Sequence, residues 1–253
     1  MLAARMRAMT GVHWLALFAL ILASWMVLFA MAVPAELRDG ARIFGSDFIA
    51  SLCNITPDGA GLVRMFGMWG LMTAAMMAPT AFPAFATYDD LSHAASETNF
   101  AALVAGYLAI WIGFSGVAAG LQMVLFRAEL VSAFGDSRSA VLSAGLLIGA
   151  GLYQFSAIKE ACLSKCRMPM TFFMQHWDEG PLRNGLRLGL VCLGCCWALM
   201  LLGFVGGVMN VAFMGLATLI MVFEKLPDLG RYVTKPLGWL LIAAGIVRIV
   251  TAF

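Results

Sequence analysis

The sequence predicts an all-α bundle of membrane-spanning helices, and three observations support this fold class. Of the 253 residues, 62% are hydrophobic and only 12% are charged. Apolar segments of about 20 residues, the length at which a helix crosses a bilayer, recur along the chain. Glycines recur inside these segments, where small residues allow helices to pack closely. We therefore treat residues 1–253 as a single polytopic membrane domain.

The hydrophobic pattern divides into about seven spans. Basic residues Arg5 and Arg7 precede the first apolar run, which is longer than the apolar region of a signal peptide and is therefore interpreted as a retained helix. The run over 186–223 is too long for one span, and Gly206-Gly207 is its natural break. Without that break the count is six. The seven predicted spans cover residues 14–33, 64–85, 100–126, 139–158, 185–205, 208–223 and 233–252.

Residues 34–62 are predicted to form an extracytoplasmic loop. Ile43, Phe44, Phe48 and Leu52 follow a helical spacing and would form the apolar face of a short interfacial helix. Cys53 lies alone in this loop, far along the chain from the other cysteines.

The distribution of basic residues predicts the orientation. With seven spans, ten of the sixteen Lys and Arg residues fall on the side of the N-terminus. The positive-inside rule then places the N-terminus in the cytoplasm. The expected location is the bacterial inner membrane, crossed several times. The net charge of +2 and the absence of a basic run argue against a nucleic-acid partner.

The stretch Cys192-Leu193-Gly194-Cys195-Cys196-Trp197-Ala198 is the strongest chemical signal in the chain. At about 100° per residue its three cysteines share one face of a helix. Thiols at this density inside an apolar span are typical of a soft-metal site or a redox pair. Packing of Cys as a small hydrophobe is the alternative interpretation.

Two further cysteines, Cys162 and Cys166, follow the fourth span. On a helix they would be i, i+4 neighbours able to bind the same ion as Cys192, Cys195 and Cys196. Nearby Lys159, Lys165 and Arg167 are expected to favour their thiolate forms and to balance the charge of a thiolate site. The alternative is a basic segment that only sets topology.

Methionines form a stripe along the second span. Met68, Met72 and Met76 continue a helical pattern from Met65 and are expected to face the cysteine-bearing helix. Thioethers are soft ligands for Cu(I), although a Met stripe more often serves packing. Pro79 is expected to kink or end this helix.

Several of these motifs together resemble the bacterial predicted metal-binding integral membrane proteins, a family labelled as a domain of unknown function. The resemblance covers roughly residues 64–226. It implies metal binding, but no reaction and no substrate. The matching pieces are Trp69-x-x-Met72-x-x-Ala75-Met76-Met77-x-Pro79, Tyr153-Gln154, Lys159-x-x-Cys162-Leu163-x-x-Cys166-Arg167-x-Pro169, Cys192-x-Gly194-Cys195-Cys196-Trp197-Ala198-Leu199-Met200, Gly207-x-Met209-Asn210 and Glu224-Lys225.

Three functions are consistent with the sequence. The first is Cu(I) handling by binding, delivery or transport, through the five cysteines and the three methionines just named; zinc is the alternative metal. The second is a membrane thiol–disulfide or quinone-linked oxidoreductase. The third is a non-catalytic subunit of a larger membrane complex. The expected partners are the lipid bilayer and a membrane protein or metallochaperone.

Overall fold

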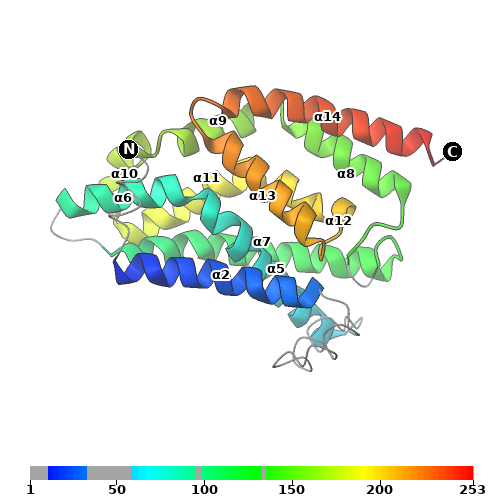
Figure 1. The fold of residues 1–253 in the computed structure, drawn as a ribbon, viewed down its shortest axis with the longest axis horizontal. Helices are drawn as coiled ribbons and strands as arrows, with labels where there is room; N and C mark the ends of the chain where they lie inside the picture. The colour runs from blue at the N-terminus through cyan, green and yellow to red at the C-terminus, as the bar shows by residue number, and fades with distance from the viewer. Residues whose placement is uncertain (1–10, 33–57, 95–98, 133–134, 253) are drawn as a thin grey trace.

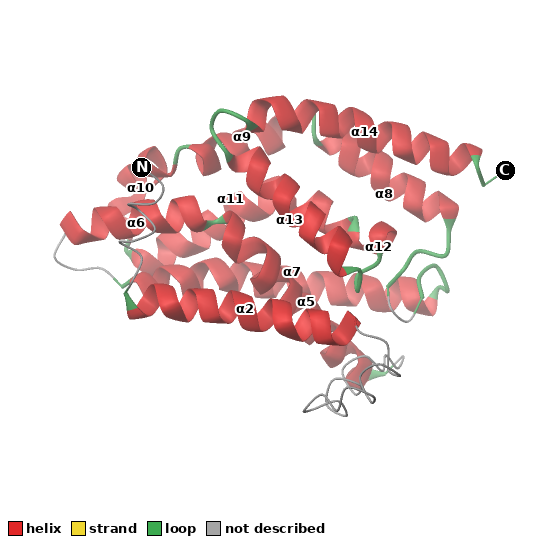
Figure 2. Ribbon diagram, viewed as in Figure 1, coloured by secondary structure: helices red, strands yellow, loops and turns green. Residues whose placement is uncertain are grey.

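The computed structural model describes residues 11–32, 58–94, 99–132 and 135–252, and the described part is helical, without a named strand (Figure 2). The predicted all-α class is confirmed. The predicted interfacial helix and Cys53 lie outside the described residues. The helices are α2 (Val12–Ala32), α5 (Gly59–Thr80), α6 (Phe82–Ala94), α7 (Phe100–Arg127), α8 (Ala140–Tyr153), α9 (Ala157–Arg167), α10 (Pro169–His176), η1 (Trp177–Glu179), α11 (Pro181–Leu201), α12 (Gly203–Gly206), α13 (Val211–Lys225) and α14 (Gly230–Val250).

Helix α11 lies inside the bundle, packed against α7 and α9 (Figure 1). Helix α5 packs between α2 and α7, while α13 joins α5 to the outer pair formed by α8 and α14 (Figure 1). This arrangement brings the carboxyl end of α5 and the carboxyl end of α13 toward α11.

Breaks in the helices follow local sequence signals. Pro79 stands in the last turn of α5, which ends at Thr80, as predicted. Gly207 adopts a φ of 91°, so the predicted break after Gly206 is confirmed, and the Asn210 side chain then caps α13 by accepting from the Phe213 amide.

Three boundaries differ from the sequence prediction. Helix α5 begins at Gly59 rather than at residue 64, because the Asp58 carboxylate caps its first turn. Residues 88–94, expected in a loop, belong to α6. The predicted span 139–158 breaks after Tyr153 and bends by 62° into α9, whose start is capped by Ser156.

Within the described part of the chain, five helices are long and apolar enough to cross a membrane, namely α2, α5, α7, α11 with its α12 extension, and α14. The bent pair α8 and α9 raises the number to six. Helix α13, predicted as a further span, has 15 residues. At 1.5 Å per residue it is about 22 Å long, shorter than a hydrocarbon core of about 30 Å. The sixth predicted span, residues 208–223, is therefore a helix shorter than the hydrocarbon core.

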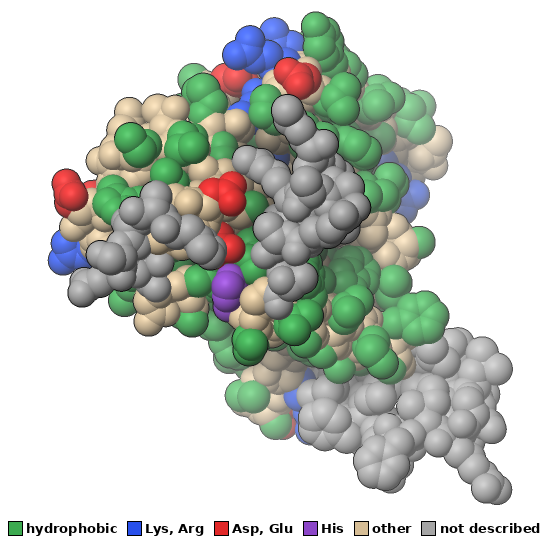
Figure 3. All heavy atoms as spheres, turned by 60° about the vertical axis from the view of Figure 1, so that its left-hand side comes forward, with side chains coloured by type: hydrophobic (Ala, Val, Ile, Leu, Met, Phe, Trp, Pro, Cys, Tyr) green, Lys and Arg blue, Asp and Glu red, His purple; other side chains and the backbone are tan. Residues whose placement is uncertain are grey.

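Apolar side chains cover much of the outer surface. Leu22, Met26 and Phe29 of α2 and Leu240 and Val250 of α14 are exposed, and apolar side chains dominate the face drawn in Figure 3. A surface of this kind is expected where a helix faces lipid rather than water.

Helices α7 and α11 approach so closely that only glycine fits between them. A Cβ at Gly106 would stand 2.4 Å from the Leu182 carbonyl oxygen, and one at Gly185 would stand 2.0 Å from the Leu103 carbonyl oxygen. Both neighbours are backbone atoms, which cannot rotate away. This contact fixes the position of α11, and with it that of the cysteines.

We predict that Gly106→Ala destabilises the purified full-length chain by about 1–3 kcal/mol, because the two backbones must separate. Gly113→Ala, on the same helix but with no atom within 4 Å of its added Cβ, is the matched control and should cause no loss. Thermal unfolding of both variants is the measurement. Equal effects at the two positions would contradict the proposed close contact.

Candidate metal centre

The thiols of Cys192, Cys195 and Cys196, named here the thiol cluster, lie together on the buried face of α11. Their sulfur atoms all lie within 4.8 Å of one another. The three side chains are 0%, 0% and 1% exposed, and the Cys195 and Cys196 sulfurs are 3.3 Å apart. Two sulfurs that each lie about 2.3 Å from one ion are separated by at most about 4.6 Å. The cluster therefore has nearly the spacing that a shared metal ion requires.

Cys192 is surrounded by polar groups from three other helices. The Lys225 Nζ atom donates to its sulfur at 2.9 Å and to the Thr80 hydroxyl at 2.6 Å. The Tyr107 hydroxyl lies 3.1 Å from the same sulfur and donates to the Met77 carbonyl at 2.9 Å. A lysine cation in contact with a thiol favours the nucleophilic, metal-binding thiolate.

Helix α9 adds two thiols beside the cluster. The Cys166 side chain lines a small pocket together with Cys192 and Lys225. A Cβ at position 194 would stand 2.6 Å from the Cys162 sulfur, so Gly194 provides the room for that side chain. Cys162 and Cys166 are half-buried, unlike the cluster itself. The two cysteine groups of the sequence thus meet where α9 crosses α11.

The methionine stripe is buried but extends away from the thiols. Met68, Met72 and Met76 are at most 4% exposed, in keeping with an interior position. Met76 lies one turn before Thr80, the residue that contacts Lys225. Met72 and Met68 lie about 12 and 18 Å from Thr80 along the helix axis. The Met72 methyl is 3.9 Å from a Cβ placed at Gly203, so it packs toward α12.

The cations nearest the cysteines in the sequence are not those that reach the cluster. Lys159, expected to balance thiolates, lies 2.9 Å from Glu224 in an ion pair with both side chains 1% exposed. Arg167 donates to the Glu224 carbonyl at 2.9 Å and lies 3.4 Å from the Glu160 carboxylate, while Lys165 is exposed. The expectation that Lys159 and Arg167 serve the thiols was therefore wrong, because carboxylate and carbonyl oxygens already engage them.

Lys225 is the residue that sequence reasoning missed. The side chains of adjacent helical residues point about 100° apart, so Glu224 and Lys225 do not form an ion pair with each other inside a bundle. Two opposite charges side by side at the end of an apolar helix thus indicate two separate buried partners. Here they are Lys159 and Cys192.

Three buried thiols at this spacing, in a helical bundle, form a site that could hold a soft metal ion. The family described as PpoB2, copper chaperone, matches residues 66–248, more than half of the chain. The chain belongs to this family, and the matched region contains the thiol cluster, both α9 cysteines and Lys225. Comparison with curated proteins and with solved structures gave no match.

The buried ion pair predicts a strong effect of one substitution on stability. Glu224→Gln leaves the Lys159 ammonium buried without its carboxylate and should destabilise the chain by about 3–5 kcal/mol. Glu179→Gln breaks the exposed pair with Arg187 and should cost less than about 1 kcal/mol. Denaturant unfolding compares the two; equal losses would show that the Lys159–Glu224 pair is not dehydrated as described.

The Lys225 contact predicts an effect on metal affinity. Lys225→Met removes the cation beside Cys192 and should weaken Cu(I) binding about 10–100-fold, as the loss of a group supporting a ligand typically does. Arg183→Gln, at an exposed position of α11, is the control and should leave affinity unchanged. Competition with a Cu(I) chelator measures both. Unchanged affinity in a folded Lys225→Met protein would remove Lys225 from the site.

Proposed function

We propose that this chain is an integral membrane protein that binds Cu(I) through Cys192, Cys195 and Cys196 and delivers it to a partner. The observation that carries the proposal is the mutual proximity of three buried thiols beside a lysine. The match to a copper chaperone family supports the identity of the cargo. Thiolate sulfur favours Cu(I) over hard divalent ions such as Mg²⁺.

Lys225 offsets part of the negative charge that a loaded thiol cluster would carry. Three thiolates around Cu(I) carry a net charge of −2, and Lys225 reduces this in an apolar interior where uncompensated charge is costly. Zinc bound by thiolates usually takes four ligands. Cys166, which lines a small pocket together with Cys192, would be the fourth ligand for zinc and an entry ligand for copper.

The half-buried thiols of α9 provide a route to and from the cluster. Cys162 and Cys166 lie between the exposed side of α9 and the buried face of α11. Copper would pass from one thiolate to the next by ligand exchange, so that it is never released as a free ion. Met76 is proposed as an accessory ligand, with Met68 and Met72 lining the interior farther along α5.

We place the protein in the bacterial inner membrane with its N-terminus in the cytoplasm. Five to six apolar helices and the apolar outer surface of α2 and α14 support insertion in a bilayer. The orientation requires that α13 also crosses the bilayer as a short span, because ten of the sixteen Lys and Arg residues then fall on the side of the N-terminus. The proposed partner is a membrane protein or metallochaperone that exchanges copper with α9.

A thiol–disulfide activity is the second candidate function, and one observation favours it. The Cys195 and Cys196 sulfurs are 3.3 Å apart. The five described cysteines are free thiols in this structure. A redox role requires a disulfide that forms reversibly, whereas the copper role requires all thiols reduced.

We predict that Cys192→Ser/Cys195→Ser/Cys196→Ser abolishes copper binding, because hydroxyl oxygen is a poor ligand for Cu(I). Cys53→Ser is the matched control and should retain the wild-type content. Elemental analysis is performed under reducing conditions on protein from carbonate-washed membranes. Equal copper in both variants would contradict copper binding by the cluster, and recovery of the chain in the carbonate-soluble fraction would contradict membrane integration. If zinc is present in the wild type and lost from the triple variant, the site holds zinc instead of copper.

The α9 thiols are tested by kinetics. Cys162→Ser/Cys166→Ser should keep the copper of the cluster but slow its transfer to a chelator at least tenfold.

Thiol alkylation before and after oxidation distinguishes the redox candidate. The oxidoreductase would be favoured by two results together. The wild-type protein would form and lose a disulfide at Cys195 reversibly, and the wild-type and triple-variant proteins would contain equal copper.

A further inference from the structure

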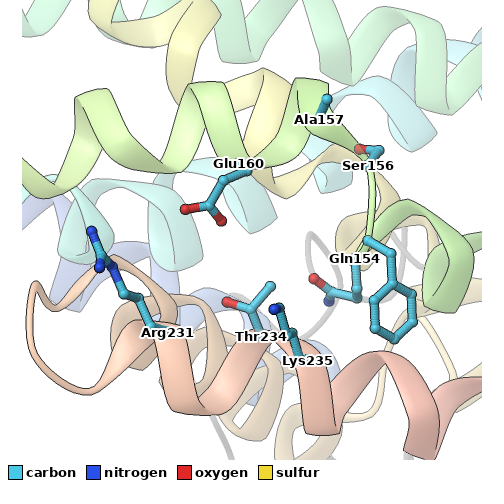
Figure 4. A pocket seen from close by; sticks show the side chains of 8 residues that line it. Gln154, Ser156, Ala157, Glu160, Arg231, Thr234 and Lys235 are labelled. Carbon is cyan, nitrogen blue, oxygen red and sulfur yellow. The ribbon is translucent and has the colours of Figure 1, made fainter.

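A pocket outside the thiol site lies between the α8–α9 bend and the start of α14. Its volume is about 640 Å³. Figure 4 shows the side chains that line it, from the α8–α9 bend on one side and from α14 on the other. None of these residues belongs to the proposed copper site.

Gln154 is the feature that indicates a ligand. Its side chain is 4% exposed and lines the pocket. Within the described residues, neither its Nε2 nor its Oε1 atom has a hydrogen-bond partner. A buried amide without partners costs free energy, about 1–3 kcal/mol, that a polar ligand would recover.

The pocket also has a positive potential. Arg231 and Lys235, one turn apart on α14, border it, and no carboxylate of the described residues forms a salt bridge with either. Helix α9 begins at its edge, with Ser156 capping the Lys159 amide. The amides of Ala157 and Ile158 in that first turn have no intrahelical acceptor and favour an anion.

Glu160 is the one acidic residue of the lining. Its side chain is 60% exposed and lies 3.4 Å from Arg167, which reduces its effect on the pocket. The remaining charge is that of two exposed cations of α14: Lys235 lies near Gln154, whereas Arg231 lies on the Glu160 side of the pocket, away from the start of α9 (Figure 4). This combination of guanidinium, ammonium, amide and backbone N–H groups matches the oxygen atoms of a phosphate.

We propose that this pocket binds a phosphate group, held by Lys235, the Gln154 amide and the first turn of α9, with Arg231 adding positive charge from the other end of the pocket. The group can belong to a phospholipid or be free phosphate. Phe155 at the rim is partly exposed, and its ring packs 5.3 Å from that of the exposed Trp239. These rings offer an apolar surface on which acyl chains would lie.

The test measures binding to the full-length chain in a neutral detergent with three probes: dioctanoyl phosphatidylglycerol, inorganic phosphate and dioctanoylglycerol. Arg231→Gln/Lys235→Gln should weaken binding of the phosphate-bearing probe at least tenfold. Arg248→Gln, an equally exposed cation on the same helix, should change it less than twofold. Binding of the phospholipid alone identifies a lipid headgroup, and comparable binding of inorganic phosphate identifies the free ion. Stronger binding of dioctanoylglycerol than of either, or equal losses in the two cation variants, would overturn the site.

Gln154→Met separates ligand binding from folding. It removes the partnerless amide at similar volume, so the thermal midpoint of the ligand-free protein should stay the same or rise. Affinity for the phosphate-bearing probe should nevertheless fall at least threefold. Glu160→Gln should raise that affinity. A fall in stability without any change in affinity for Gln154→Met would show that Gln154 is only structural.

Discussion

The contact between Lys225 and Cys192 is the interaction around which the candidate site is built. It joins the end of α13 to the middle of α11, and the same ammonium binds Thr80 at the end of α5. A buried ammonium is tolerated only where several acceptors replace its water. Three helices must therefore meet at one point, and that point is where the three thiols gather.

The neighbouring Glu224–Lys159 ion pair fixes the position of α9 relative to α13. Since Glu224 engages Lys159 of α9, the α13 end holds α9 and α11 together with adjacent side chains. The Arg167 side chain adds a contact to the Glu224 carbonyl. The position of α9 follows from these contacts, and Cys162 and Cys166 are consequently placed against the cluster rather than facing away from it.

The sequence predicted the helical class, the positions of most helices and the shared face of Cys192, Cys195 and Cys196, because these depend on local periodicity. It could not show which cation reaches the thiols. Lys159 and Arg167 are near the cysteines in sequence, yet Glu224, Glu160 and Thr234 engage them. Likewise, α8 packs against α14 up to the bend after Tyr153, and α13 lies between the positive-φ Gly207 and the extended Leu226. Such features are set by tertiary contacts that periodicity does not encode.

We propose that the thiol cluster holds Cu(I) with sulfur as its only ligand type. X-ray absorption at the copper edge of the loaded, reduced protein tests it most directly. The account predicts a Cu(I) edge and about three sulfur atoms at roughly 2.3 Å, the distance typical of thiolate bound to a metal of this size. A coordination shell dominated by nitrogen or oxygen would contradict it.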